Sequence, residues 1–274
     1  MIAILLMTLA QFIAYTRAEL AKGGLEKVQF AETTYFRGGE GDVFVLLHGA
    51  NDQAGTWFAV APKLAKTHRV LVLDLPGHGE SGPHEGPLPL SMMVERLHAL
   101  LEHEKVGRVT LVGNSMGGWI AMLYAMQYPE QVDRLVLEDA SGMMWPLSVP
   151  LFATNREEAI KILHAVHGPK AETPEWVIDA LLQPDAGTPM KRVMAGGVLD
   201  FFVDNKLSSL KTSAVLIWGK DDGLLPVAYA EALQKRLAGS RLFVIDGAAH
   251  MPHRQQPEKF LECLSKSSSP SARE

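Results

Sequence analysis

A glycine-flanked serine lies between an apolar strand pattern and an apolar helix pattern, and this junction constrains the fold more than any other stretch. Residues 108–112 are mostly apolar, as in a short buried strand, and residues 116–128 carry apolar side chains at helical spacing. Gly113 and Gly117 flank Ser115 where a Cβ atom would collide with the neighbouring strand or helix. The pattern predicts a tight strand-to-helix turn with Ser115 exposed at its tip, as a candidate nucleophile.

The alternation of strand and helix continues on both sides of this turn. Apolar runs of about five residues are typical of parallel strands buried on both faces. The alternation predicts an α/β fold with a mostly parallel, doubly wound sheet. The further strands are expected at 28–36, 43–47, 69–73, 132–137, 214–218 and 241–245, and the further helices at 57–66, 91–104, 226–237 and 257–264.

The alternation stops between residues 143 and 207, where helical patterns continue without a convincing strand. We expect residues 143–207 to form a helical cap over the carboxyl edge of the sheet, where open α/β sheets bind ligands. Residues 21–142 and 208–274 would then form the core, with a loose polar tail after Lys266. A chain of 274 residues is long enough for such a domain with an insertion.

Residues 1–20 form a separate N-terminal segment whose first fifteen residues are nearly all apolar. This run is short for a bilayer span. Thr16 and Ala18 are small, as a signal peptidase requires, but no Lys or Arg precedes the apolar run. An export signal, a membrane-surface anchor through residues 1–15 and a helix packed on the domain all remain open. The pattern favours export or membrane association over a cytoplasmic location.

Charge and cysteine content narrow the function classes. The formal net charge is -5 and no Lys/Arg run is present, so the sequence predicts no nucleic-acid partner. The single cysteine, Cys263, excludes an intramolecular disulfide, and no Cys/His cluster has the spacing of a zinc site. We therefore expect a small-molecule substrate and no metal. The sequence does not address the oligomeric state.

Two polar residues follow the last two expected strands. A serine hydroxyl is a weak nucleophile at neutral pH, so it needs an adjacent base that a third group orients. Asp222 and His250 come after the strands that follow the expected cap. Because carboxyl ends of parallel strands share one edge of a sheet, both can converge on Ser115.

These stretches together resemble the α/β-hydrolase fold family, and the resemblance covers about residues 28–264. It is greatest to serine esterases and monoacylglycerol-lipase-like members, with some similarity to carbon-carbon bond hydrolases that cleave ring-fission products. The matching motifs are His48-Gly49, Asp74-Leu75-Pro76-Gly77-His78-Gly79, Gly113-Asn114-Ser115-Met116-Gly117-Gly118, Trp218-Gly219-Lys220-Asp221-Asp222 with Pro226, Gly247-Ala248-Ala249-His250 and Pro257-Glu258-Lys259-Phe260.

The resemblance implies a role for each residue of the site. Ser115 would attack a substrate carbonyl, His250 would take and return the proton, and Asp222 would orient the imidazole. The backbone N–H groups of Ala50 and Met116 would form the oxyanion hole. No cofactor is implied.

The family pattern also supplies alternatives. Some members place the acid after the sixth strand, which makes Asp139 the reserve acid. His253 follows His250 by three residues and so competes for the role of base, but its position is where the family lines the pocket or the cap rim. His48 and His78 are expected to support their loops by hydrogen bonding.

The apolar start of the expected cap suggests either an acyl-chain pocket lined by Met143 and Trp145, with Asn51 and Met251 nearby, or packing of these cap residues onto the core. We therefore expect a hydrolase of short or medium acyl esters or monoacylglycerol esters. The alternatives are a carbon-carbon bond hydrolase and a receptor-like protein that binds without turnover. The first is disfavoured because residues 49–53 lack a Gly-Pro-rich oxyanion loop and Met251 replaces a tryptophan after the histidine.

Overall fold

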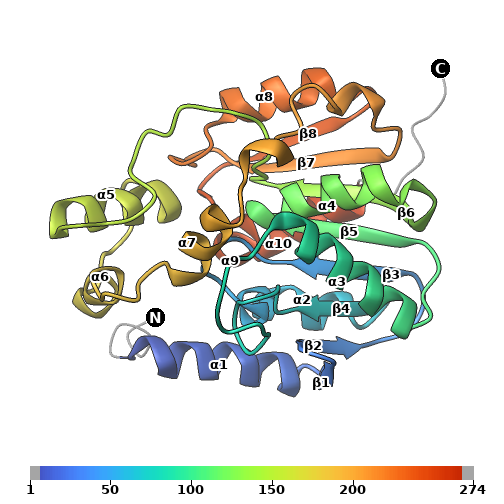
Figure 1. The fold of residues 1–274 in the computed structure, drawn as a ribbon, viewed down its shortest axis with the longest axis horizontal. Coiled ribbons are helices and arrows are strands. Elements are labelled where there is room, and N and C mark those ends of the chain that lie inside the picture. Colours follow the sequence, from blue (N-terminus) through green and yellow to red (C-terminus); the bar gives the residue numbers. More distant parts are fainter. Residues whose placement is uncertain (1–6, 267–274) are drawn as a thin grey trace.

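Eight strands form one sheet, in the order β1-β2-β4-β3-β5-β6-β7-β8, in the computed structural model, which describes residues 7–266 (Figure 1). Strands β4, β3, β5, β6, β7 and β8 pair in parallel, whereas the β1–β2 hairpin joins β4 antiparallel. The expected mostly parallel α/β sheet is confirmed. The strands are β1 (Glu26–Phe30), β2 (Thr33–Gly38), β3 (Val43–Leu47), β4 (Arg69–Leu73), β5 (Val109–Asn114), β6 (Val132–Glu138), β7 (Ser213–Gly219) and β8 (Arg241–Ile245).

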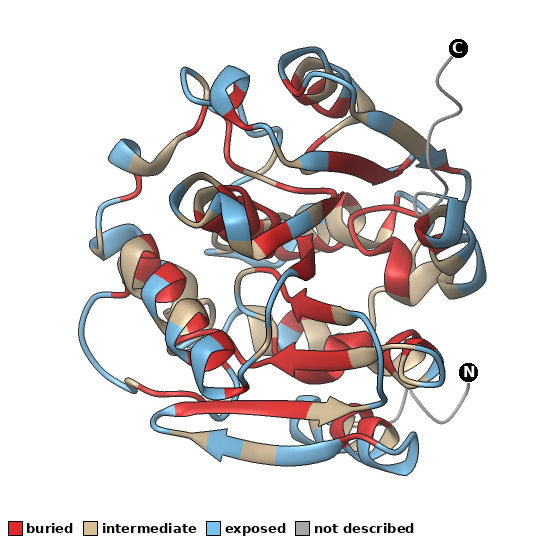
Figure 2. Ribbon diagram, turned by 90° about the vertical axis from the view of Figure 1, so that its right-hand side faces the viewer, coloured by how far each residue is buried: buried red, intermediate tan, exposed pale blue. Residues whose placement is uncertain are grey.

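Alternating side chains create two helix layers. Val45 and Leu47 of β3 pack with α3, α4 and α8, whereas Phe44 and Leu46 pack with α1, η2, α2 and α10 on the opposite face. Because both faces are covered, the inner strands are buried along most of their length, and the outer strand β1 is largely exposed (Figure 2). These helices are α1 (Leu9–Lys22), η2 (Ala54–Ala59), α2 (Ala61–Leu64), α3 (Leu90–His103), α4 (Met116–Gln127), α8 (Val227–Arg236) and α10 (Pro257–Lys266), with the short turns η3 (Pro129–Gln131) and α9 (Pro252–Gln255) between them.

Two local expectations were wrong. The helix expected at 57–66 is a 3-10 turn, η2, followed by the separate short helix α2. Pro62 lies in the first turn of α2, where its missing N–H costs nothing, and so starts a new helix. The single strand expected at 28–36 is a hairpin, because Ala31 adopts a positive φ of 50° between β1 and β2.

Residues 143–207, the expected cap, are all described and contain no strand. Their backbone touches the loops that follow β7 and β8. The N–H of Gly223 donates to the carbonyl of Ala165 at 2.9 Å, and the N–H of His250 donates to the carbonyl of Val166 at 3.0 Å. The helices in this part of the chain are α5 (Arg156–His167), α6 (Glu175–Leu181), α7 (Thr188–Ala195), η4 (Leu199–Phe201) and η5 (Leu207–Ser209).

The N-terminal helix α1 packs on η2 and buries Thr16, Arg17 and Leu20. Thr8 caps it, since its hydroxyl accepts from the backbone N–H of Gln11 and the Gln11 side chain accepts from the N–H of Thr8. Within residues 7–266, no helix has both the length and the apolar character needed to cross a bilayer. The first six residues of the expected apolar segment and the tail after Lys266 lie outside the described residues.

Candidate active site

Ser115 occupies a strained backbone conformation between β5 and α4. Its φ is 53° and its ψ is -117°, a region that residues with a Cβ atom rarely adopt. Neighbouring glycines make the turn sterically feasible. A Cβ on Gly117 would lie 2.3 Å from the Leu47 carbonyl oxygen, and one on Gly113 would lie 2.4 Å from the backbone of Gly117. The turn therefore has the geometry that the sequence predicts for a nucleophile elbow.

His250 and Asp222 form a buried pair. The Nδ1 of His250 lies 2.8 Å from one Asp222 carboxylate oxygen. The other oxygen accepts from the N–H groups of Leu224 and Leu225, at 2.8 and 3.0 Å. Burial by itself would lower the pKa of His250, but the charge and hydrogen bond of Asp222, together with the charge of Glu138, raise it above its ordinary value. Asp222 is thus placed to orient the imidazole and stabilise its protonated form.

Backbone contacts fix the loop that carries His250. The Asn114 side chain donates from Nδ2 to the carbonyl of His250 at 2.9 Å. The N–H of His250 donates to Val166, in the last turn of α5. The carboxyl end of a helix carries partial negative charge, which favours a protonated imidazole nearby. The elbow and residues 143–207 therefore both hold the candidate base.

Asp139 lies directly behind Asp222. It is fully buried, accepts from the N–H of Gly219 at 3.0 Å and hydrogen-bonds to Asp222. Burial raises the pKa of Asp139 well above its ordinary value, and the negative charge of Asp222 adds to the shift. The raised pKa favours the protonated form of Asp139, whose O–H can donate a hydrogen bond to Asp222. Asp222, rather than the reserve acid, makes the hydrogen bond to His250.

His253 does not lie at the pocket rim, so its predicted place was wrong. It is fully buried between η2 and the end of β6. Its Nδ1 lies 2.7 Å from a Glu138 oxygen and its Nε2 lies 3.0 Å from the Thr56 hydroxyl. Its ring centroid lies 4.1 Å from that of Trp57. The buried Glu138 carboxylate requires a polar partner, and His253 supplies it.

The predicted oxyanion loop, residues 48–53, runs beside Ser115, since a Cβ on Gly49 would lie 3.2 Å from the Ser115 Cβ. As expected, His48 supports it. Its Nε2 accepts from the N–H of Leu75 at 3.0 Å, and its Nδ1 lies 2.7 Å from the carbonyl oxygen of Gly49. Burial lowers the pKa of His48, which keeps the ring neutral. Met116 begins α4, where backbone N–H groups have no intrahelical acceptor.

A cavity of about 450 Å³ opens at Ser115 and His250. The candidates Ala50, Asn51, Met116, Met143, Trp145 and Met251 all line it, and Asp222 lies outside it behind His250. The Asn51 side chain accepts from the N–H of Met190 at 2.9 Å and so links the oxyanion loop to α7.

Sequence reasoning missed most of the apolar wall. These positions gave no separate signal, because the apolar face of a helix looks the same whether it meets a core or a cavity. The additional lining residues include Trp119, Ile162, Val166, Met190, Val193, Met194, Val198, Leu199, Phe202, Leu224 and Leu225.

Three residues of the site have side chains of the types that bind metal ions. Among residues 7–266, Asp139, Asp222 and His250 form a group whose ligand atoms lie within 4.8 Å of one another. Those atoms already bond to each other, as a triad acid and base require.

A family model described as "Alpha/beta hydrolase family" matches residues 44–262. The chain belongs to the alpha/beta hydrolase family. This hydrolase is 24% identical to human monoacylglycerol lipase ABHD6 over 267 residues, covering 87% of this chain and 79% of the relative. It is 27% identical to pimeloyl-[acyl-carrier protein] methyl ester esterase of Aeromonas hydrophila, covering 83% and 96%.

A solved structure also shares the fold of this hydrolase. The crystal structure of a membrane phospholipase A, a bacterial virulence factor, superposes on this hydrolase with a TM-score of 0.80 and 25% identity. The superposition covers 95% of this chain and 93% of that one. Enzymes that hydrolyse esters are therefore among the relatives of this hydrolase.

Proposed function

We propose that this hydrolase cleaves carboxylic esters with short or medium acyl chains, or monoacylglycerol esters, through an acyl-enzyme on Ser115. The observation that carries the proposal is the mainly apolar cavity, which is bordered by Ser115 and by a His250 that is hydrogen-bonded to Asp222. No cofactor is part of the proposal.

In the proposed mechanism, the Ser115 hydroxyl attacks the ester carbonyl while Nε2 of His250 accepts its proton. The resulting oxyanion is stabilised by the N–H groups of Ala50 and Met116. His250 then donates the proton to the alcohol oxygen as the carbon–oxygen bond breaks. Water attacks the acyl-enzyme with His250 again as base, and Ser115 recovers its proton as the carboxylic acid leaves.

The rim of the cavity supports a lipid-like acyl group. Leu147, Leu151, Met194 and Leu199 line the cavity and are also exposed to solvent, Leu199 at 75%. An apolar lining that continues to the surface suits an acyl chain better than a charged ring-fission product. The relatives named for lipase and esterase activity favour the same substrate class.

We propose residues 143–207 as the cap of the site and residues 21–142 with 208–274 as its core. The cap residues Trp145, Met190 and Val193 would form the acyl-binding wall. We also propose association of the apolar residues 1–15 with a membrane surface, where such esters reside.

Hydrolysis of p-nitrophenyl esters from acetate to palmitate tests the reaction. Ser115→Ala should lower kcat by about 10⁴-fold or more. Ser141→Ala is the matched control, since Ser141 also lines the cavity, and it should retain activity within about tenfold. If wild-type protein cleaved no ester, the proposal would fail, and a ring-fission dienoate would be the next substrate. A protein inert toward both would be the receptor-like alternative.

The same ester series tests the acyl pocket. Val193 is buried and lines the cavity, so Val193→Phe should shorten the pocket and move the preferred ester to a shorter chain. Val203 is equally buried but lies outside the cavity, so Val203→Phe should leave the preferred length unchanged. An unchanged chain-length preference in Val193→Phe would place the acyl group elsewhere.

A further inference from the structure

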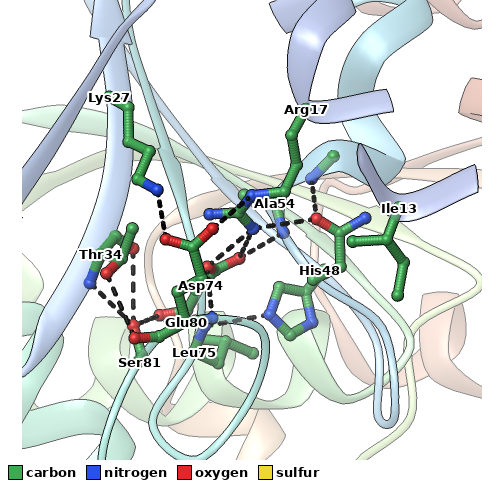
Figure 3. A network of polar contacts seen from close by, with 12 residues as sticks. Ile13, Arg17, Lys27, Thr34, His48, Ala54, Asp74, Leu75, Glu80 and Ser81 are labelled. Carbon is green, nitrogen blue, oxygen red and sulfur yellow. Dashed lines mark hydrogen bonds and ion pairs between the residues drawn. The ribbon is translucent and has the colours of Figure 1, made fainter. Parts of the chain in front are cut away.

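Arg17 carries a buried guanidinium from the N-terminal helix α1 into the core. Its Nη1 donates to both oxygens of Asp74, at 3.1 and 2.9 Å, and to Oε1 of Gln53 at 3.1 Å. Its Nε lies 3.2 Å from Glu80. Figure 3 shows the guanidinium pointing toward Asp74 beside His48 and Ala54. A buried carboxylate needs such a partner, and Asp74 is fully buried.

Asp74, which bonds to Arg17, and its neighbour Leu75 contact the two ends of the oxyanion loop. At its start, His48 accepts from the N–H of Leu75. Just beyond its end, the N–H of Ala54 donates to Asp74 at 2.7 Å. The neighbouring residues Asp74 and Leu75 therefore hold the two ends of the loop that contains Ala50. Arg17 is the positively charged partner of the Asp74 carboxylate.

Helix α1 also lies directly against Gln53 and Gly55. A Cβ on Gly55 would lie 2.4 Å from the Thr16 hydroxyl oxygen, so a side chain there would displace Thr16. The side chain of Gln53 contacts Thr16 and Arg17 and also accepts from the N–H of Gly55 at 2.7 Å. Gln53, the last residue of the oxyanion loop, thus bonds directly to α1.

We propose that Arg17 is a positioning residue for the oxyanion hole and that docking of α1 sets the geometry of residues 48–54. Arg17 acts through Asp74 and Gln53 and does not touch the substrate. The N-terminal helix is on this account part of the catalytic apparatus. The kinetic side of this inference rests on the proposed ester hydrolysis.

A second arginine–carboxylate pair serves as the control that distinguishes this positioning role from a general loss of stability. Arg69 starts β4 and pairs with the buried Glu104, whereas Asp74 follows the other end of the same strand. Arg69→Gln and Arg17→Gln each remove an arginine from a buried carboxylate, but Arg17 alone adjoins the oxyanion loop. Arg17→Lys provides a milder variant that retains the positive charge.

The experiment measures ester kinetics and backbone amide hydrogen exchange on the folded full-length variants. Arg17→Gln should lower kcat by about 10- to 100-fold with KM changed less than about threefold, because oxyanion stabilisation acts in the transition state. Amides of residues 49–54 should exchange faster in Arg17→Gln than in wild type. Arg17→Lys should show a smaller change in both measurements, and Arg69→Gln should show neither.

Equal kcat in Arg17→Gln and Arg69→Gln would overturn the inference, as would unchanged exchange at residues 49–54. A rise in KM alone would also overturn it. Should the wild type cleave no ester, the proposed function fails, and the exchange comparison still decides whether Arg17 holds the loop.

Discussion

Asn114, the residue before the candidate nucleophile, donates a 2.9 Å hydrogen bond from its side chain to the carbonyl oxygen of His250. The same amide group reaches the carbonyl of Glu138 at 3.4 Å. The β5–α4 turn and the loop after β8 are thereby joined through a single buried side chain. We therefore expect the position of His250 relative to Ser115 to depend on this contact.

Replacing Asn114 should impair catalysis more than binding. Asn114→Ala removes the donor to His250, so we expect kcat to fall by about tenfold or more with little change in KM. Asn155 caps α5 away from the cavity, so Asn155→Ala should cost about 1 kcal/mol of stability and leave kcat unchanged. Steady-state kinetics and urea unfolding of both variants provide the measurements. Equal kcat values would contradict the positioning role.

The two buried acids should respond differently to the same substitution. Asp222→Asn removes the charge that orients His250 and should lower kcat by about 10⁴-fold. The raised pKa favours a protonated Asp139, and the amide of Asp139→Asn retains both the acceptor for the N–H of Gly219 and a donor toward Asp222. Asp139→Asn should therefore change kcat by less than about tenfold. The reverse order of effects would make Asp139 the triad acid.

Asp139 also predicts a pH effect on stability. Its pKa is raised in the folded state, so the folded protein binds a proton that the unfolded chain releases above the ordinary value of 3.8. The stability linked to this proton is fully present at lower pH and is lost as pH rises through the folded pKa. Asp139→Asn lacks this pH dependence. The free energy of unfolding of the variant should therefore increase relative to that of wild type as pH rises. Parallel curves would contradict a raised pKa of Asp139 in the folded protein.

The pH dependence of the reaction rate should follow the pKa of His250. As a base the imidazole must be neutral, so activity falls as pH drops through its pKa. Because that pKa is raised, the acidic limb of kcat/KM should have its midpoint above the ordinary value of 6.5. In Asp222→Asn burial dominates, and the residual activity should show a limb shifted to lower pH. A wild-type midpoint below 6.5 would be inconsistent with the His250–Asp222 pair.

The elbow glycines should tolerate no side chain. Gly117→Ala places a Cβ against the Leu47 carbonyl and should cost about 1–3 kcal/mol of stability along with activity. Gly107 is exposed and has no atoms near its Cβ position, so Gly107→Ala should change stability by less than about 0.5 kcal/mol. Urea unfolding compares the two variants, and equal losses would show that crowding at Gly117 is relieved.

Much of this fold could be predicted because its signals are local. The apolar runs of β3 and β5 and the Gly-x-Ser-x-Gly turn each depend on a few neighbouring residues, and their order along the chain points to a parallel sheet. The positions of Ser115, Asp222 and His250 after strands are local features too. The break between η2 and α2 was missed although Pro62 is a local signal.

The parallel strands, the turn at Ser115 and the candidate residues follow from local sequence, because hydrophobic period and backbone sterics act over a few residues. Other features of the site depend on contacts between distant segments. Only the folded chain decided that His253 pairs with Glu138, that Asp139 lies behind Asp222, and that Arg17 reaches Asp74. Each of these depends on burial and on a polar contact between residues more than fifty positions apart, which no local pattern encodes.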